Sequence, residues 1–175
     1  DPTLTLQPDA TAGKDSTVFA ATPTVAGGSL DYLGANSTNT PLYRSFFQFD
    51  VSSIPATATV SSAVLTLYSY PSFIAAATIN INRLTRAWVE ADATWNKADS
   101  GTNWTTAGGD FDAAVSASQV YVADANFVQD MAALVQAWVN GTYSNYGVVI
   151  KPNNEPVTSG GLFWKSSDHA TAAER

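Results

Sequence analysis

The chain contains no cysteine and only one histidine, His169. The absence of cysteine excludes disulfides, thiolate metal sites and cysteine nucleophiles. His169 lies in the polar segment S-S-D-H-A-T (166–171), and no nucleophile elbow occurs in the chain, so a serine–histidine–aspartate triad has no support. An H-E-x-x-H motif, a P-loop and a dinucleotide-binding fingerprint are also absent. We therefore predict no catalytic centre and no enzymatic activity.

Charge is scarce as well, because only 13% of the residues are charged, half the usual ~25%. Eight basic residues face fifteen acidic ones, and the basic residues are scattered, so the net charge is −7 without any basic stripe. Nucleic acid and anionic membranes are therefore not expected as partners, because the chain offers no cluster of positive charge to bind them. No apolar segment is long enough to span a membrane. Cations, neutral glycans and protein surfaces are the partners that this charge permits.

Length and composition favour one folded domain over residues 1–175. Hydrophobic residues make up 45% of the chain and aromatic residues 11%, which is enough to bury a core. The polar residues are mainly serine, threonine and asparagine, as is common on secreted β-proteins. The sequence begins at Asp1 without a methionine or a signal peptide, which we expect of a processed or excised piece. We predict an extracellular or cell-surface location.

Alternation of apolar and polar residues dominates the chain and predicts strands. The predicted strands cover residues 3–7, 43–50, 60–70, 78–85, 146–151 and 161–165. Residues 101–118 are glycine-rich and are predicted to form an ordered loop. One segment has helical spacing, because Phe127, Met131, Leu134 and Trp138 follow one another by four, three and four. We predict an all-β antiparallel sandwich with one inserted α-helix at about residues 124–140, ending before Gly141.

Six phrases also occur in a familiar order. They are R-S-F-F-Q-F-D-V-S-S-I-P (44–55), V-S-S-A-V-L-T-L-Y (60–68), R-A-W-V-E-A-D-A-T-W-N (86–96), W-T-T-A-G-G-D-F-D (104–112), L-V-Q-A-W-V-N-G-T-Y-S-N-Y-G-V-V-I (134–150) and S-S-D (166–168). The chain thereby resembles the DNRLRE domain family, which is related to the repeat domain of archaeal disaggregatases and to a family of carbohydrate-binding modules.

This resemblance implies a jelly-roll-like sandwich on exported proteins, often beside polysaccharide-degrading domains. Some members of the family bind acidic polysaccharides such as alginate, whereas the few lysines and arginines here favour a neutral glycan. Family members usually continue past the position of Arg175 with a short apolar strand. We therefore expect this domain to lack its closing strand, and an open sheet edge is a template for a strand of another chain.

Two sets of residues are candidates for binding. Sugar recognition needs exposed aromatic rings, and the surface candidates are Trp104, Tyr32, Tyr143 and Tyr146. The other tryptophans are expected to be structural. Calcium prefers oxygen ligands, and the candidates in glycine-containing loops are Asp9, Asp15, Asp110 and Asp112. Such a site is expected to brace a loop, and no other cofactor is predicted.

Paired carboxylates are the only enzymatic signal in the sequence. Glu90 with Asp92, or Asp110 with Asp112, has the composition of a glycosidase pair. We favour a structural role instead, with Glu90 bonded to backbone or paired with Arg86. The predicted function is a non-catalytic extracellular module that binds a polysaccharide or cell-envelope glycan. The alternative is a subunit of an extracellular filament or sheath, which assembles with copies of itself by β-strand donation.

Overall fold

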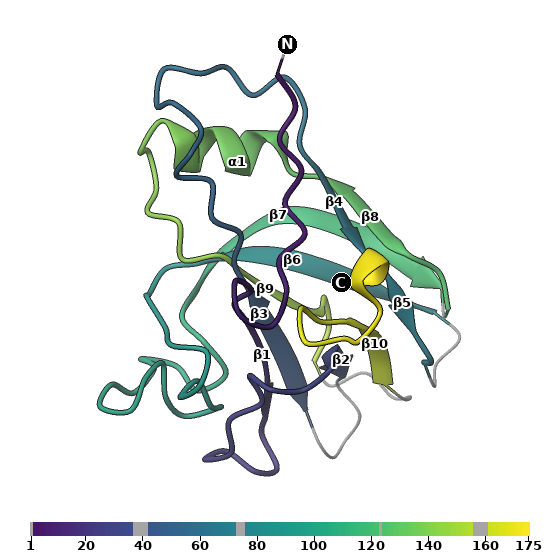
Figure 1. The fold of residues 1–175 in the computed structure, drawn as a ribbon. Coiled ribbons are helices and arrows are strands. Elements are labelled where there is room, and N and C mark those ends of the chain that lie inside the picture. The colour runs from purple at the N-terminus through teal and green to yellow at the C-terminus, as the bar shows by residue number, and fades with distance from the viewer. Residues whose placement is uncertain (1, 37–41, 73–75, 123, 156–160) are drawn as a thin grey trace.

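A computed structural model describes residues 2–36, 42–72, 76–122, 124–155 and 161–175 (Figure 1). This part of the chain contains ten strands, one α-helix and one short 3₁₀ helix, so the prediction of an all-β fold with one helix is confirmed. The elements are β1 (Asp15–Phe19), β2 (Tyr32–Asn36), β3 (Tyr43–Phe47), β4 (Val64–Leu67), β5 (Ser69–Tyr70), β6 (Ala76–Leu84), β7 (Phe111–Val122), β8 (Phe127–Asp130), α1 (Ala132–Val139), β9 (Val148–Pro152), β10 (Gly161–Lys165) and η1 (Ala172–Glu174).

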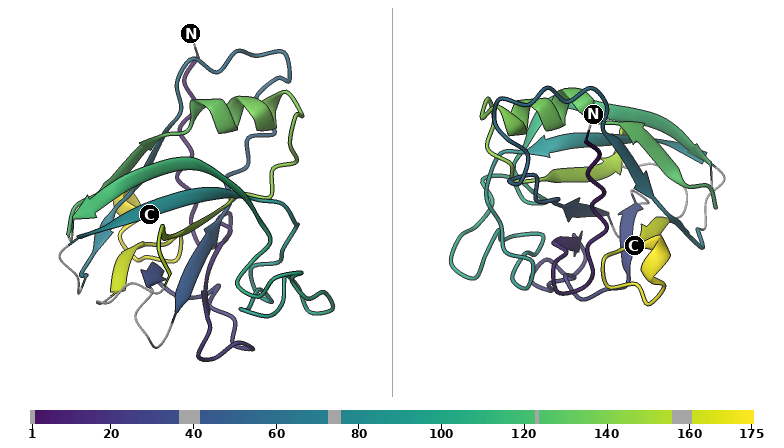
Figure 2. Two further views of the ribbon diagram at one scale, coloured as in Figure 1. Left: turned by 180° about the vertical axis from the view of Figure 1, so that it is seen from behind. Right: turned by 45° about the horizontal axis from the view of Figure 1, so that its top comes forward.

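The strands pair antiparallel throughout the described residues. The large sheet has the order β5-β10-β2-β3-β9-β6-β7, with β1 paired to β3, and β4 pairs with β8 in a second sheet. Ser45 pairs with Thr17 of β1 and with Ile150 of β9, so these two strands flank β3 on opposite sides. Figure 2 shows the strands curving into layers around a shared interior. The architecture is an antiparallel β-sandwich.

The central strand β9 is buried along its whole length because both of its faces are covered. Ile150 and Val148 face the core between the layers. The same core contains Tyr121 and Trp164, whose rings meet edge to face with their centroids 5.1 Å apart. Val149 faces the other way, into a second core beneath the loops between β6 and β7. Burial of each large apolar side chain contributes roughly 1.5–3 kcal/mol, so both cores hold the loops and the sheets together.

The predicted helix at 124–140 is too long, because its first half is strand β8. Phe127 pairs with Leu67 and is completely buried, so its apolar side chain belongs to the β4–β8 sheet. Asn126 accepts a hydrogen bond from the N–H of Ser69, at the start of β5. The spacing from Phe127 to Met131 therefore bridges a strand and a helix. Gly141, with a φ of 75°, follows the helix as predicted.

Other boundaries also need correction. Residues 3–7 lie outside the sheets as extended chain, with Leu4 49% and Leu6 38% exposed. The predicted loop at 101–118 contains the first eight residues of β7, the longest described strand. The predicted strand at 60–70 is divided between β4 and β5, which pair with different partners. The prediction of β10 at 161–165 is confirmed. No helix in the described ranges is long and apolar enough to cross a membrane.

Candidate functional site

The segment between β6 and β7 projects from the sheets as a lobe of loops, drawn in teal in Figure 2. A cleft of about 580 Å³ lies where this lobe meets the strands. The cleft is lined by Thr85, Arg86, Ala87, Thr105, Thr106, Gly109, Asp110, Phe111 and Tyr146. It is an open depression rather than an enclosed cavity.

Buried tryptophans make the lobe rigid. The indole nitrogen of Trp88 donates to the carbonyl of Tyr146, and that of Trp104 donates to the carbonyl of Thr94, each at 2.9 Å. Both rings pack edge-on against Phe46. The turn that closes the lobe has positive φ at Gly108 (88°) and at its neighbour (108°), a conformation that favours glycine. The cleft is therefore largely preformed.

The polar wall of the cleft is a closed network around Asp110. Its Oδ2 accepts from Nε of Arg86 at 2.6 Å, and the N–H groups of Thr105 and Thr106 donate to the same carboxylate at 3.0 and 2.9 Å. Burial acts to raise the pKa of Asp110, but these N–H groups and the guanidinium together hold it below its ordinary value. The carboxylate is thus ionised and its charge is balanced by Arg86, so this pair adds no net charge to the cleft.

The predicted aromatic residues do not form one platform. Tyr146 lines the cleft beside Phe111, and both rings are partly buried against the lobe core. Tyr143 is 43% exposed and lies elsewhere, with the Arg83 guanidinium 3.9 Å from its ring centroid. Tyr32 lies on β2 and contacts the ring of Phe163 edge-on at 5.3 Å. Only Tyr146 of the four candidates therefore belongs to the cleft.

The prediction for Trp104 needs correction, because this ring is only 5% exposed and cannot stack on a ligand. Its segment T-N-W-T-T-A-G-G has the composition of a surface loop, and nothing in that composition shows that the ring turns inward. The contact with Phe46 of β3 makes Trp104 a core residue. Arg86 and Phe111 were missed as cleft residues, because only the folded loops bring them beside Tyr146.

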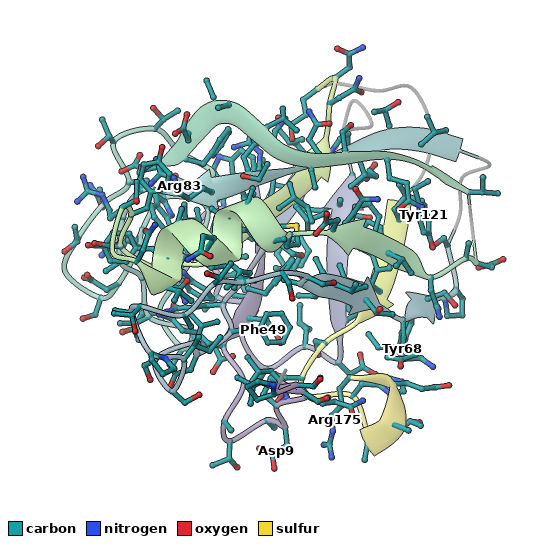
Figure 3. The ribbon with its side chains drawn as sticks, turned by 90° about the horizontal axis from the view of Figure 1, so that it is seen from above. Asp9, Phe49, Tyr68, Arg83, Tyr121 and Arg175 are labelled. Carbon is teal, nitrogen blue, oxygen red and sulfur yellow. The ribbon has the colours of Figure 1, made fainter. Side chains whose placement is uncertain are left out.

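The four predicted calcium ligands are also not assembled. Asp9 accepts hydrogen bonds from the N–H groups of Thr11 and Ala12 in an exposed turn, and it lies beside Arg175 (Figure 3). Asp110 binds Arg86, as described above. Asp112 pairs with Arg83 at 2.7 Å, and Figure 3 shows Arg83 well apart from Asp9. Only Asp15 lies in a carboxylate cluster.

That cluster consists of Asp15, Glu90 and Asp168, whose carboxylate oxygens lie within 4.8 Å of one another. Burial raises the pKa of Asp15 to about 6, against the opposing effect of the Ser167 N–H that donates to it. Burial also raises the pKa values of Glu90 and Asp168. Sequence reasoning missed the cluster because its members are 75 and 78 residues apart. The phrases W-V-E and S-S-D contain the partners, but no spacing rule joins them.

The expectation for Glu90 is confirmed in part. Its Oε1 accepts from the N–H of Asp15 at 2.8 Å, which is the backbone contact that was predicted. The alternative partner, Arg86, binds Asp110 instead.

A comparison with curated proteins found no match. A comparison with protein families matched residues 15–175 to the disaggregatase related repeat domain. The matched region contains every residue of the cleft and all three members of the carboxylate cluster. The matched family is one of the relatives that the sequence analysis named beside the DNRLRE domain family. The assignment to the DNRLRE family itself stays a prediction. Because the match covers nearly the whole chain, this protein belongs to the disaggregatase related repeat domain family.

Proposed function

We propose that this domain is a non-catalytic extracellular module that binds a neutral polysaccharide in the cleft beside Tyr146. The observation that supports this proposal most directly is the composition of the cleft. Partly buried rings of Tyr146 and Phe111 lie next to the charge-balanced pair of Arg86 and Asp110. Sites for small ligands combine apolar surface with a few fixed polar groups in this way.

The charge of the cleft favours an uncharged sugar over a polyanion. A polyanion requires lysine or arginine whose charge is free to oppose it, whereas Arg86 already faces Asp110 at 2.6 Å. A neutral glycan carries hydroxyls, and the fixed guanidinium and carboxylate offer a donor and an acceptor side by side. The scattered lysines and arginines in the rest of the chain are consistent with the same choice.

A glycosidase pair made by Asp110 and Asp112 has less support. A catalytic acid must hold a proton near neutral pH, and enzymes raise a carboxyl pKa for this purpose. The pKa of Asp110 is instead held low, and the pKa of Asp112 is lowered by the Ala114 N–H and by Arg83. We therefore propose binding without hydrolysis.

Affinity electrophoresis tests the proposal, with galactomannan, xyloglucan or dextran cast in the gel and with alginate as a polyanionic comparison. We expect a neutral polysaccharide to retard the protein more than alginate does. Tyr146→Ala should weaken that retardation at least about fivefold, the loss typical of a central aromatic contact. Tyr143→Ala is the matched control and should have no effect, because this ring lies outside the cleft. Retardation that survives Tyr146→Ala would place the binding site elsewhere.

A second candidate function, strand-mediated self-assembly, has one specific observation in its favour. Residues 3–7 alternate T-L-T-L-Q, lie extended outside any described sheet, and expose Leu4 and Leu6. Strand β7 stands at the end of the sheet order and exposes Val120 and Val122. An added strand would bury apolar side chains on both partners. Light scattering after size exclusion separates the proposals, because a Leu4→Asp/Leu6→Asp variant should lose assembly while it keeps glycan binding.

A further inference from the structure

Three distant segments of the chain converge on the carboxylate cluster. Asp15 is the first residue of β1, Glu90 lies in the lobe, and Asp168 follows β10. The carboxylate oxygens of all three lie within 4.8 Å of one another. Figure 1 shows the yellow C-terminal segment beside the purple segment that leads into β1. The cluster is therefore a place where tertiary structure, rather than local sequence, concentrates negative charge.

Basic side chains of the described residues offset little of this charge. None of the three carboxylates forms an ion pair with lysine or arginine in the described part of the chain. Lys14 acts on Glu90 only through space, as the weakest of the influences on its pKa, while its Nζ donates to Gln48 at 2.8 Å and lies over the ring of Trp88. Asp15 is only 5% exposed, so water screens its charge poorly. Like charges this close together favour either protonation or a bound cation.

A buried hydroxyl gives independent evidence for a ligand. Ser167 is 6% exposed, and its Oγ makes no hydrogen bond within the described residues. The backbone N–H of the same residue donates to Oδ2 of Asp15. The hydroxyl lies close enough to that carboxylate to help lower its pKa, but the distance and angles between them do not make a regular hydrogen bond. A buried hydroxyl without a partner is costly. A cation among the carboxylates would give this oxygen a partner.

The backbone around the cluster is closely packed. A Cβ on Gly13 would collide with the side chain of Ser167, and a Cβ on Gly28 would collide with Glu90. The N–H of Asp15 also fixes one oxygen of Glu90 at 2.8 Å. The ligand oxygens are therefore held in place by backbone from separate segments.

We propose that Asp15, Glu90 and Asp168, with the hydroxyl of Ser167, bind one calcium ion. Oxygen donors alone suit a hard cation, and calcium accepts carboxylate and neutral oxygens in an irregular arrangement. Magnesium demands a near-ideal octahedron and keeps several waters, and zinc favours histidine and cysteine. The ion joins the start of β1, the lobe and the segment after β10, and so stabilises the sandwich. This proposal does not depend on glycan binding.

The test is calorimetric titration and thermal unfolding of the 175-residue chain after chelator treatment, with CaCl₂ or MgCl₂ as the probe. Calcium at a hundredfold excess over its dissociation constant should raise the unfolding midpoint by roughly 5–10 °C. Magnesium should bind at least about tenfold more weakly. Glu90→Gln and Asp168→Asn should each reduce calcium affinity at least about tenfold. Asp92→Asn, two residues from Glu90 but outside the cluster, is the matched control and should behave as the wild type.

Both site variants are near-isosteric and remove charge from a crowded cluster, so they should fold in chelator. Their unfolding midpoints without calcium check this directly. Absence of binding heat and of any midpoint shift for the wild-type chain at millimolar calcium would overturn the proposal. Equal calcium effects in the wild type and in both site variants would also overturn it, because the ion would then bind elsewhere.

Discussion

Two groups of acidic residues in this domain have opposite surroundings. Asp110 and Asp112, at the start of β7, each contact an arginine at 2.6–2.7 Å. Asp15, Glu90 and Asp168 contact one another, and their pKa values are raised where those of the β7 acids are lowered. Both groups contain aspartates that the sequence predicted as calcium ligands. The difference shows that charge balance in three dimensions, rather than residue type in a loop, separates a structural ion pair from a candidate cation site.

The largest expected effect comes from removing a cation from a buried pair. Arg44 binds Glu155, and both side chains are only 11% exposed. We expect Arg44→Met to lower the free energy of unfolding by about 3 kcal/mol, because it leaves a buried carboxylate with only Lys151 nearby at 3.5 Å. Urea unfolding at pH 7 measures this change. Lys97→Met, at an exposed position, is the control and should change stability by less than about 0.5 kcal/mol. Equal effects of the two substitutions would contradict the argument.

An intermediate effect is expected at Asp110. Asp110→Asn should lower the free energy of unfolding by about 1 kcal/mol at pH 7, because the charge-assisted bonds to Arg86 and to two N–H groups weaken. The folded pKa lies below the ordinary value of 3.8, so this stabilisation is complete above that pH and is lost as the pH falls through the folded pKa. Urea unfolding at pH 7 and at pH 2.5 should therefore show that the gap between wild type and variant narrows in acid. A gap that is constant with pH would show that ionisation of Asp110 is irrelevant.

The smallest effect should have the opposite sign. In chelator at pH 7, Asp168→Asn should raise the free energy of unfolding by no more than about 0.5 kcal/mol, because it removes one of several like charges. Thermal unfolding of the two proteins in parallel measures the difference. A clear loss of stability in chelator would show that Asp168 stabilises the calcium-free protein. In that case Asp168 would not differ from Asp110 and Asp112 in its effect on folding.

Local pattern was a good guide where one strand faces one core. In β10 the alternation of Leu162 and Trp164 marks two fully buried positions, and the predicted bounds agree with the structure. The pattern failed at β8 and α1, because Phe127 and Met131 have helical spacing although a strand ends between them. It also failed for β7, whose run of alanine, serine and valine is largely exposed and carries little apolar periodicity.

The candidate sites show the same division more sharply. Tyr146 was identified from its residue type and does line the cleft, whereas Trp104 was identified in the same way and is core. An aromatic ring packs or binds according to the side on which its loop folds back, and neighbouring residues do not encode that side. Glu90 and Asp168 were not selected as ligands, because their partner is 75 or more residues away.

The sequence alone determined the all-β class, the single helix and the absence of recognisable catalytic motifs. Periodicity and composition act over a few residues, and they are sufficient for these conclusions. Only the tertiary structure decided which acids are neutralised and which are crowded together. Electrostatic energy depends on distances through space and on burial, and the fold sets both when it brings β1, the lobe and the segment after β10 to one point. Lysine and arginine are scarce in this sequence, and at that point three carboxylates meet without an ion pair to either residue in the described part of the chain.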